Sequence, residues 1–141
     1  MISTLKKIGS IIFMNAGDHV QYTKSATTSA PDNSQVEAIE FSVPEDGTIR
    51  LKYYLYESGS TTFRSAVGRI YLNGSSLFTD ITSGEGSPNL NVSRDIDVKA
   101  GDVVRLLVSV QNVAQSAYID AHINNIRICT LETRTINFTI L

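Results

Sequence analysis

The sequence predicts an all-β fold, an antiparallel β-sandwich with roughly eight or nine strands. Apolar residues alternate with polar ones in several runs between residues 41 and 106, and each run adjoins a turn rich in Pro, Asp, Asn or Gly. Such alternation buries one side of each strand, as in antiparallel sheets. The 141 residues suffice for one domain with its own core, and the single cysteine, Cys129, excludes an intrachain disulfide.

The expected elements follow in chain order. A first strand covers residues 10–14, and the polar stretch 23–35 is expected to be a loop. Alternation predicts strands at 39–43, 48–56, 66–72, 96–98, 104–110, 117–123, 126–128 and 136–140, with loops at 57–65 and 75–93, the latter holding a short strand at 77–81. The apolar parity changes between Ile123 and Ile126, which predicts a bulge at Asn124 and Asn125. Residues 3–8 are compatible with a short helix or with extended chain.

Glycines mark the expected turns. Gly47 follows Pro44, Gly74 follows Asn73, and Gly101 precedes Asp102. Asn-Gly is a strong hairpin signal, so we expect a positive φ at Gly74. The strands between these turns predict a core that includes Phe41, Ile49, Leu51, Leu55, Ile70, Leu72, Val104, Leu106, Val108 and Ile119.

The chain divides into an N-terminal arm at residues 1–35, a sandwich core at 36–130 and a C-terminal strand at 131–141. In that last strand Ile136, Phe138 and Ile140 face one way. An exposed apolar strand edge is a liability, so the strand is expected to dock on its own sheet or on a neighbouring subunit. Docking on a neighbour favours a homo-oligomer, with these three residues as candidate subunit contacts.

Charge and hydropathy exclude two classes of partner. The formal net charge is −2 and the isoelectric point is near 5.6, whereas nucleic-acid binding needs a concentrated basic face. No apolar run approaches the roughly 20 residues of a membrane-spanning helix. Lys6 and Lys7 precede an apolar stretch, but Gly9 and Ser10 interrupt it and no cleavage site follows. We therefore expect a first strand there and not a signal peptide.

The sequence offers no pattern that carries catalysis. His19 and His122 each lie near an aspartate, but no third metal ligand has a recognisable spacing, so we expect no metal and no cofactor. Cys129 is expected to pack as a small apolar residue. Acidic residues occur mainly where turns favour them, and no pair of carboxylates can be nominated as an acid–base dyad. We therefore expect a non-enzymatic protein.

One strand face stands out as a candidate binding surface. On residues 48–56 the predicted outward side chains are Arg50, Lys52, Tyr54 and Tyr56, a mixture of cations and aromatic rings. Tyrosine and arginine are enriched where proteins meet partners. The alternative is an ordinary solvated strand face, with its tyrosines packed under a loop or under the other sheet.

The order of turns resembles a known group of sandwich modules. Pro44-x-Asp46-Gly47 before a strand, Asn73-Gly74 closing a hairpin and Ala100-Gly101-Asp102 before another strand lie within residues 36–128. This pattern is similar to jelly-roll domains in tail, baseplate and receptor-binding proteins of bacteriophages and prophages, and more distantly to the tumour-necrosis-factor-like jelly roll. The N-terminal arm and the C-terminal strand extend beyond the part that is similar.

The resemblance implies a non-enzymatic virion structural protein, associated with the tail or baseplate, that is made in the host cytoplasm and acts by assembling with other virion proteins. The alternative is a carbohydrate-binding module that recognises a host cell-wall polysaccharide. Tyr54, Tyr56, Tyr71 or Tyr118 would then supply a stacking platform for sugar rings.

Overall fold

A computed structural model of the chain describes residues 10–14, 19–22, 26–28, 35–59, 64–82, 89–112, 119–130 and 136–141. These residues form an all-β sandwich of two antiparallel sheets, as the sequence predicts. Eleven strands lie within the described ranges. They are β1 (Ser10–Met14), β2 (His19–Tyr22), β3 (Ala26–Thr28), β4 (Val36–Ser42), β5 (Gly47–Gly59), β6 (Arg64–Leu72), β7 (Ser75–Ile81), β8 (Asn89–Val98), β9 (Val103–Asn112), β10 (Ile119–Thr130) and β11 (Ile136–Ile140).

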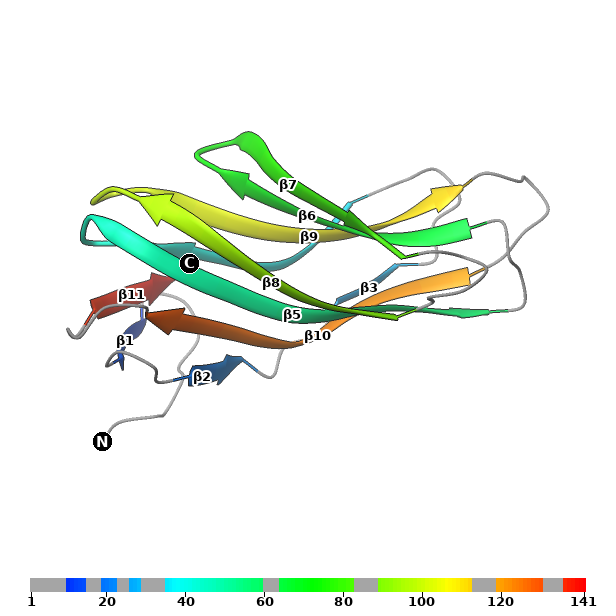
Figure 1. The fold of residues 1–141 in the computed structure, drawn as a ribbon, viewed down its shortest axis with the longest axis horizontal. Helices are drawn as coiled ribbons and strands as arrows, with labels where there is room; N and C mark the ends of the chain where they lie inside the picture. The colour runs from blue at the N-terminus through cyan, green and yellow to red at the C-terminus, as the bar shows by residue number, and fades with distance from the viewer. Residues whose placement is uncertain are drawn as a thin grey trace.

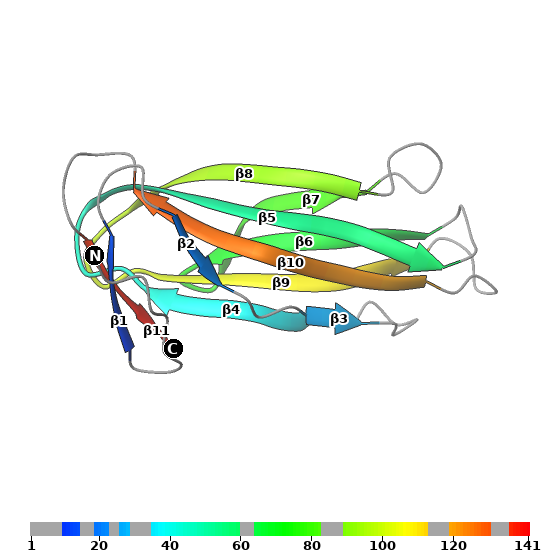
Figure 2. The ribbon, with the colours of Figure 1, turned by 90° about the horizontal axis from the view of Figure 1, so that it is seen from below.

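The strands form two layers. Sheet A has the order β1-β11-β4-β9-β6-β7, and sheet B has the order β2-β10-β5-β8, with β3 also paired to β10. In Figure 1 the strands β6, β7 and β9 lie above β5 and β10, and in Figure 2 the outer side of sheet B is in front. The described strands leave β7 at one edge of sheet A and β8 at one edge of sheet B.

Several predicted loops are strands in the structure. Strand β3 falls within the expected loop 23–35, β5 continues to Gly59, and β6 begins at Arg64. Within the expected loop 75–93, the short strand predicted at 77–81 is confirmed as β7, and the start of β8 also lies there. Strands β2 and β3 have no counterpart among the predicted strands, and they raise the number of described strands above the predicted eight or nine. The start of β8 was predicted as a loop because its outward residues are polar. Asn91 and Ser93 are exposed on this edge strand and resemble loop sequence.

The core lies between the sheets and largely matches the prediction. Phe41, Ile49, Leu51, Leu55, Ile70, Val104, Leu106 and Val108 are all fully buried. Leu72 is a correction, since it is only half-buried and lies at the end of β6, beside the turn at Asn73. The side chain of Ile119 lies outside the described part of the structure.

Turn geometry agrees with the glycine pattern. Asn73 and Gly74 both have positive φ, 51° and 83°, as a two-residue type I′ hairpin requires. Gly47 and Gly101 also have positive φ, 153° and 90°. The register of β10 shifts between Asn124 and Arg127, and Asn125 has φ 52°, which confirms the predicted bulge.

The C-terminal strand belongs to its own sandwich. Strand β11 pairs with β1 on one side and with β4 on the other, where Ile140 is opposite Phe41. Ile140 is 2% exposed and packs in the core, which corrects its nomination as a subunit contact. Ile136 and Phe138 pair through their backbones with Met14 and Ile12, and their side chains lie outside the described part.

Two further expectations concern residues outside the described ranges: the helix or extended chain at 3–8, and Tyr118. Within the described ranges, no helix has the length and apolar character to cross a membrane.

Candidate functional site

The predicted surface residues lie together on the outer side of sheet B. Strand β5 alternates, so that Ile49, Leu51, Tyr53 and Leu55 are all fully buried between the sheets. Arg50, Lys52, Tyr54 and Tyr56 point the other way and are each half-buried. Neighbouring strands β8 and β10 add their own outward side chains, and we call this surface the outer face of sheet B (Figure 2).

Strand register arranges this face in rows across β8, β5 and β10. Each row joins one residue from each strand, in the order Asp95–Arg50–Cys129, Ser93–Lys52–Arg127, Asn91–Tyr54–Asn124 and Asn89–Tyr56–His122. The rings therefore occupy two neighbouring rows flanked by amides, and the cations occupy the next two. Side chains directly opposite each other interact most strongly in an antiparallel sheet.

Three rings form a continuous ladder on the face. Tyr54 and Tyr56 have ring centroids 5.2 Å apart at an angle of 33°, and Tyr56 stacks on His122 at 4.5 Å and 13°. The His122 Nε2 atom is 2.8 Å from the Ser58 hydroxyl, which holds the imidazole in place. Tyr56 thus has a ring on each side, whereas Tyr54 has one ring neighbour among the described residues. Tyr54 is therefore the ring best placed to accept a further flat group.

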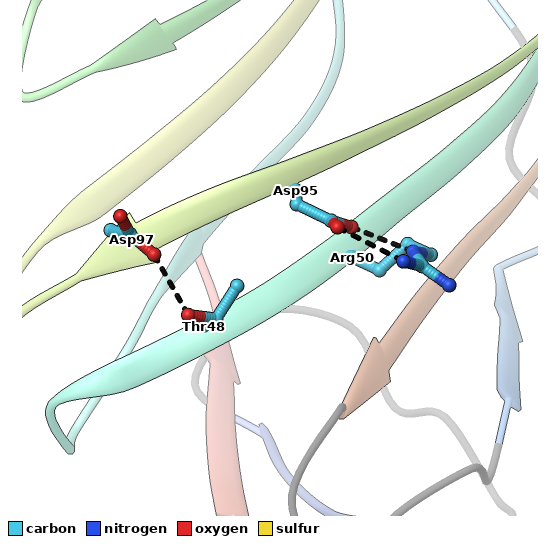
Figure 3. A network of polar contacts seen from close by, with 4 residues as sticks. All are labelled: Thr48, Arg50, Asp95 and Asp97. Carbon is cyan, nitrogen blue, oxygen red and sulfur yellow. Dashed lines mark hydrogen bonds and ion pairs between the residues drawn. The ribbon is translucent and has the colours of Figure 1, made fainter.

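Near the start of β5, Thr48 and Arg50 form hydrogen bonds with acidic residues of β8. Figure 3 shows Arg50 bound to Asp95 through two hydrogen bonds, Nε to Oδ1 at 2.6 Å and Nη2 to Oδ2 at 2.9 Å. The Thr48 hydroxyl donates to Asp97 Oδ1 at 2.7 Å. The hydrogen bond from Arg50 lowers the pKa of Asp95 and raises the pKa of the guanidinium. The charge of Arg50 is thus already paired within the protein.

A second polar cluster lies between the sheets beside the edge strands β7 and β8. The Tyr53 hydroxyl donates to Asp80 Oδ2 at 2.9 Å, and Arg94 binds both Asp80 oxygens while lying 4.8 Å over the Phe78 ring. Burial raises the pKa of Tyr53, and the charge of Asp80 adds to that effect. Asp80 and Arg94 also line a recess of about 230 Å³ along β8. Because both Asp80 oxygens are bound, this carboxylate serves the structure.

Residues nominated for metal binding or reactivity are dispersed. His122 belongs to the ring ladder, and His19 is opposite Cys129, seven residues further along β10. At about 3.3 Å per residue, the two histidines lie roughly 20 Å apart. Among the described residues, no three His, Cys, Asp or Glu side chains gather into a metal-binding group. Cys129 is 3% exposed, and burial raises the pKa of its thiol, which favours the unreactive protonated form.

Sequence reasoning found the tyrosines of this face but not all of its members. Tyr71, proposed as an alternative platform, lies on β6 in sheet A and accepts a hydrogen bond from Gln35 Nε2 at 3.5 Å, away from Tyr54. His122 and Arg127 were not assigned to this face. Their positions follow from the parity of β10, in which Ala121, Ile123, Ile126 and Ile128 point inward.

Comparison with solved structures gives similarity at the level of the fold. The C-terminal domain of EclA, described as a sugar-binding protein, has a TM-score of 0.50 at 10% identity, over 76% of this chain and 78% of that chain. A family 35 carbohydrate-binding module from Clostridium thermocellum has 0.44 at 11%, over 86% and 98%. The VP2 subviral particle of infectious bursal disease virus has 0.45 at 8%, over 93% and 39%. At 10% identity the EclA match supports the sandwich fold alone. Neither a protein-family profile nor a curated protein sequence matches the chain.

Proposed function

We propose that this domain is a non-catalytic carbohydrate-binding module that uses the outer face of sheet B. The ring ladder of Tyr54, Tyr56 and His122 is the observation that carries this proposal. Aromatic side chains offer a broad apolar surface for the C–H face of a sugar at a low cost in side-chain entropy. Amides flank the rings, with Asn91 and Asn124 on either side of Tyr54. Amides both donate and accept hydrogen bonds, as sugar hydroxyls require.

The non-catalytic part of the proposal is supported by how the acidic groups are used. Asp80 is held by Tyr53 and Arg94, and Glu57 Oε2 accepts a hydrogen bond from the Thr82 hydroxyl at 2.5 Å. Glycoside hydrolysis needs two carboxyl groups that flank an open cleft, one to donate a proton and one to act as base or nucleophile. A sheet face with rings and amides supports binding without this chemistry.

The resemblance to bacteriophage tail, baseplate and receptor-binding proteins supports a place in a virion for this module. The sugar would then belong to the surface of the host cell. The fold is compatible with this role and does not select it, since similar sandwiches include both a sugar-binding domain and a viral particle protein.

The test is a glycan array followed by titration calorimetry with Tyr54→Ala. We expect Tyr54→Ala to weaken binding about tenfold, because it removes a stacking ring. Tyr71→Ala, which removes a half-buried tyrosine from sheet A, should leave the affinity unchanged. Binding that survives Tyr54→Ala, or a protein that retains no glycan at all, would exclude this face as a sugar site.

Assembly with other virion proteins is a second candidate function, favoured by the edge strand β7. Leu77 and Ile81 lie on β7 and are 42% and 47% exposed. An edge strand with exposed apolar side chains suits addition of a strand from another protein chain. Light scattering tests this proposal. If the protein self-associates at micromolar concentration and Ile81→Lys restores a monomer, β7 is the interface, whereas a monomer at all concentrations would exclude self-assembly.

A further inference from the structure

Two cations face each other across the outer face of sheet B. Lys52 on β5 is directly opposite Arg127 on β10, and both side chains are half-buried on the outward side. Like charges directly opposite each other in a sheet repel and destabilise it. Among the described residues neither of them forms an ion pair, since Arg127 Nε donates only to the neutral carbonyl oxygen of Asn125, at 3.2 Å.

The described cross-strand neighbours of this cation pair supply no free carboxylate. The opposite neighbour of Lys52 on β8 is Ser93, which is uncharged. The carboxylate in the next row, Asp95, is bound to Arg50 by two hydrogen bonds. Toward the other end of β10, Asp120 lies three rows away, opposite Ser58. Two positive charges therefore lie together in the middle of a face whose nearby carboxylate is already engaged.

The cation pair adjoins the side of the ring ladder on which no described ring follows Tyr54. Along the outward side of β5, Tyr54 lies between Tyr56 and Lys52, and Tyr56 covers only one side of its ring. Successive outward residues of a strand are about 7 Å apart, which is close to the width of one sugar ring. A sugar stacked on the open side of Tyr54 would hold its substituents within reach of the Lys52 ammonium and the Arg127 guanidinium.

We infer that the ligand of this face is an acidic saccharide, whose anionic group binds between Lys52 and Arg127 while its ring stacks on Tyr54. This inference rests on the proposed function, because it names the class of sugar that the same face takes. A carboxylate or a phosphate satisfies both cations at once, and a guanidinium binds either group through two hydrogen bonds. Ligand binding converts a repulsive pair into a charge-neutralised one, which gives an acidic sugar an advantage over a neutral sugar of the same shape.

The test uses the full chain and an immobilised panel of oligosaccharides. The panel holds uronic-acid oligomers, the same oligomers with their carboxylates methyl-esterified, glycosylated glycerol-phosphate oligomers, and neutral gluco-, manno- and galacto-oligosaccharides. We expect binding to a carboxylate or phosphate member at least about tenfold tighter than to its uncharged counterpart, and weaker as salt is raised. The uronic-acid and glycerol-phosphate arms distinguish the source of the anion.

Variants assign the effect to the two cations. Lys52→Gln and Arg127→Gln should each weaken binding of the acidic oligosaccharide about tenfold and leave the melting temperature unchanged or raised. Arg105→Gln is the matched control, because it removes one positive charge from the outer side of sheet A and should leave binding unchanged. Equal binding of acidic and neutral members that Tyr54→Ala abolishes would overturn this inference and keep the proposed function. Binding that Tyr54→Ala does not affect, or no binding to any member, would overturn both.

Discussion

The outer faces of the two sheets differ in how they use their charges. On sheet A the guanidinium of Arg105 is bound by two acidic residues of β4, at 2.9 Å from Glu37 and 3.2 Å from Glu40. Arg69 donates to the hydroxyl of Ser109, and Val67 beside it is fully buried. On sheet B, Lys52 and Arg127 face each other, and a ladder of rings runs alongside. Among the described residues, Arg105 and Arg69 on the outer face of sheet A are both bound by partners from the same sheet, whereas Lys52 and Arg127 on the outer face of sheet B form no ion pair.

This difference supports the proposal that the outer face of sheet B binds a ligand. A surface that serves only to enclose a core gains from pairing every charge, as Arg105 does with Glu37 and Glu40. Opposed cations that persist beside an aromatic platform cost stability in the free protein. Function is the usual reason for such a local conflict between sequence and structure. The contrast can be tested by measuring the stability of variants from each layer.

The largest loss of stability is expected in the core, because both sheets pack against it. Leu106 on β9 is fully buried in the core between the sheets. Leu106→Ala should lower the free energy of unfolding by about 2–5 kcal/mol, because it removes buried apolar surface and leaves a cavity. Urea unfolding measures this loss, and Ser93→Ala on the exposed face of β8 is the control with an expected change within about 0.5 kcal/mol. A loss below about 1 kcal/mol for Leu106→Ala would contradict the burial of Leu106 between the two sheets.

The second effect concerns the polar link between the sheets. Tyr53→Phe removes the hydrogen bond to Asp80, while Arg94 still binds the carboxylate, so we expect a loss of about 1–2 kcal/mol at neutral pH. Because burial raises the folded-state pKa of Tyr53, its contribution is fully present below the unfolded pKa of about 10 and is lost as pH rises further.

Urea unfolding at pH 8 and at pH 10.5 measures this dependence. The wild-type protein should lose more stability between these two values than Tyr53→Phe does. Tyr54→Phe, on the outer face of sheet B, is the control and should behave as the wild type does. An equal alkaline loss in the wild type and in Tyr53→Phe would show that the buried hydroxyl does not hold its proton on folding.

The sequence was sufficient to predict which side chains of β5 point inward, but not which strands pair with β5. Alternation alone placed Ile49 inward and Tyr54 outward, because a strand between two sheets buries every second residue. The Tyr56–His122 stack and the opposition of Lys52 to Arg127 join β5 to β10, more than 60 residues along the chain. Only the strand order brings them together, and no local pattern encodes that order.

The short strands were missed for a related reason. Strands β2 and β3 are four and three residues long, too brief for a periodic signal, and they exist through their pairing with β10. The Tyr53–Asp80 hydrogen bond is equally non-local, since it joins the inner side of sheet B to edge strand β7 of sheet A. The sequence feature that could have predicted this bond is Asp80, a polar residue at an inward position of β7.

The third prediction compares the faces by the sign of a stability change. Arg105→Gln breaks a paired charge and should lower the free energy of unfolding by up to about 1 kcal/mol, as exposed ion pairs do. Lys52→Gln relieves repulsion from Arg127 and should leave it unchanged or raise it by about 0.5 kcal/mol. Thermal melts at low and high salt measure both, and the two effects should shrink together as salt screens the charges. Equal losses in both variants would remove the contrast between the faces.

The smallest effect concerns Arg50 and Asp95, which form the ion pair seen among the described residues on the outer face of sheet B. The hydrogen bond from Arg50 lowers the folded-state pKa of Asp95, so its contribution to stability is present above the unfolded pKa of about 3.9 and is lost as pH falls through the folded value. The two side chains are 37% and 47% exposed, so water screens the pair and little stability depends on it. The titration itself is the sensitive readout. An NMR titration of the Asp95 carboxyl carbon should show a midpoint below the ordinary value in the wild type and a return toward about 3.9 in Arg50→Gln, with Arg105→Gln as the control that leaves it unchanged. If Arg50→Gln does not move the midpoint, Arg50 does not form a stable ion pair with Asp95 in solution. It would then be a third cation available to a ligand beside Lys52 and Arg127.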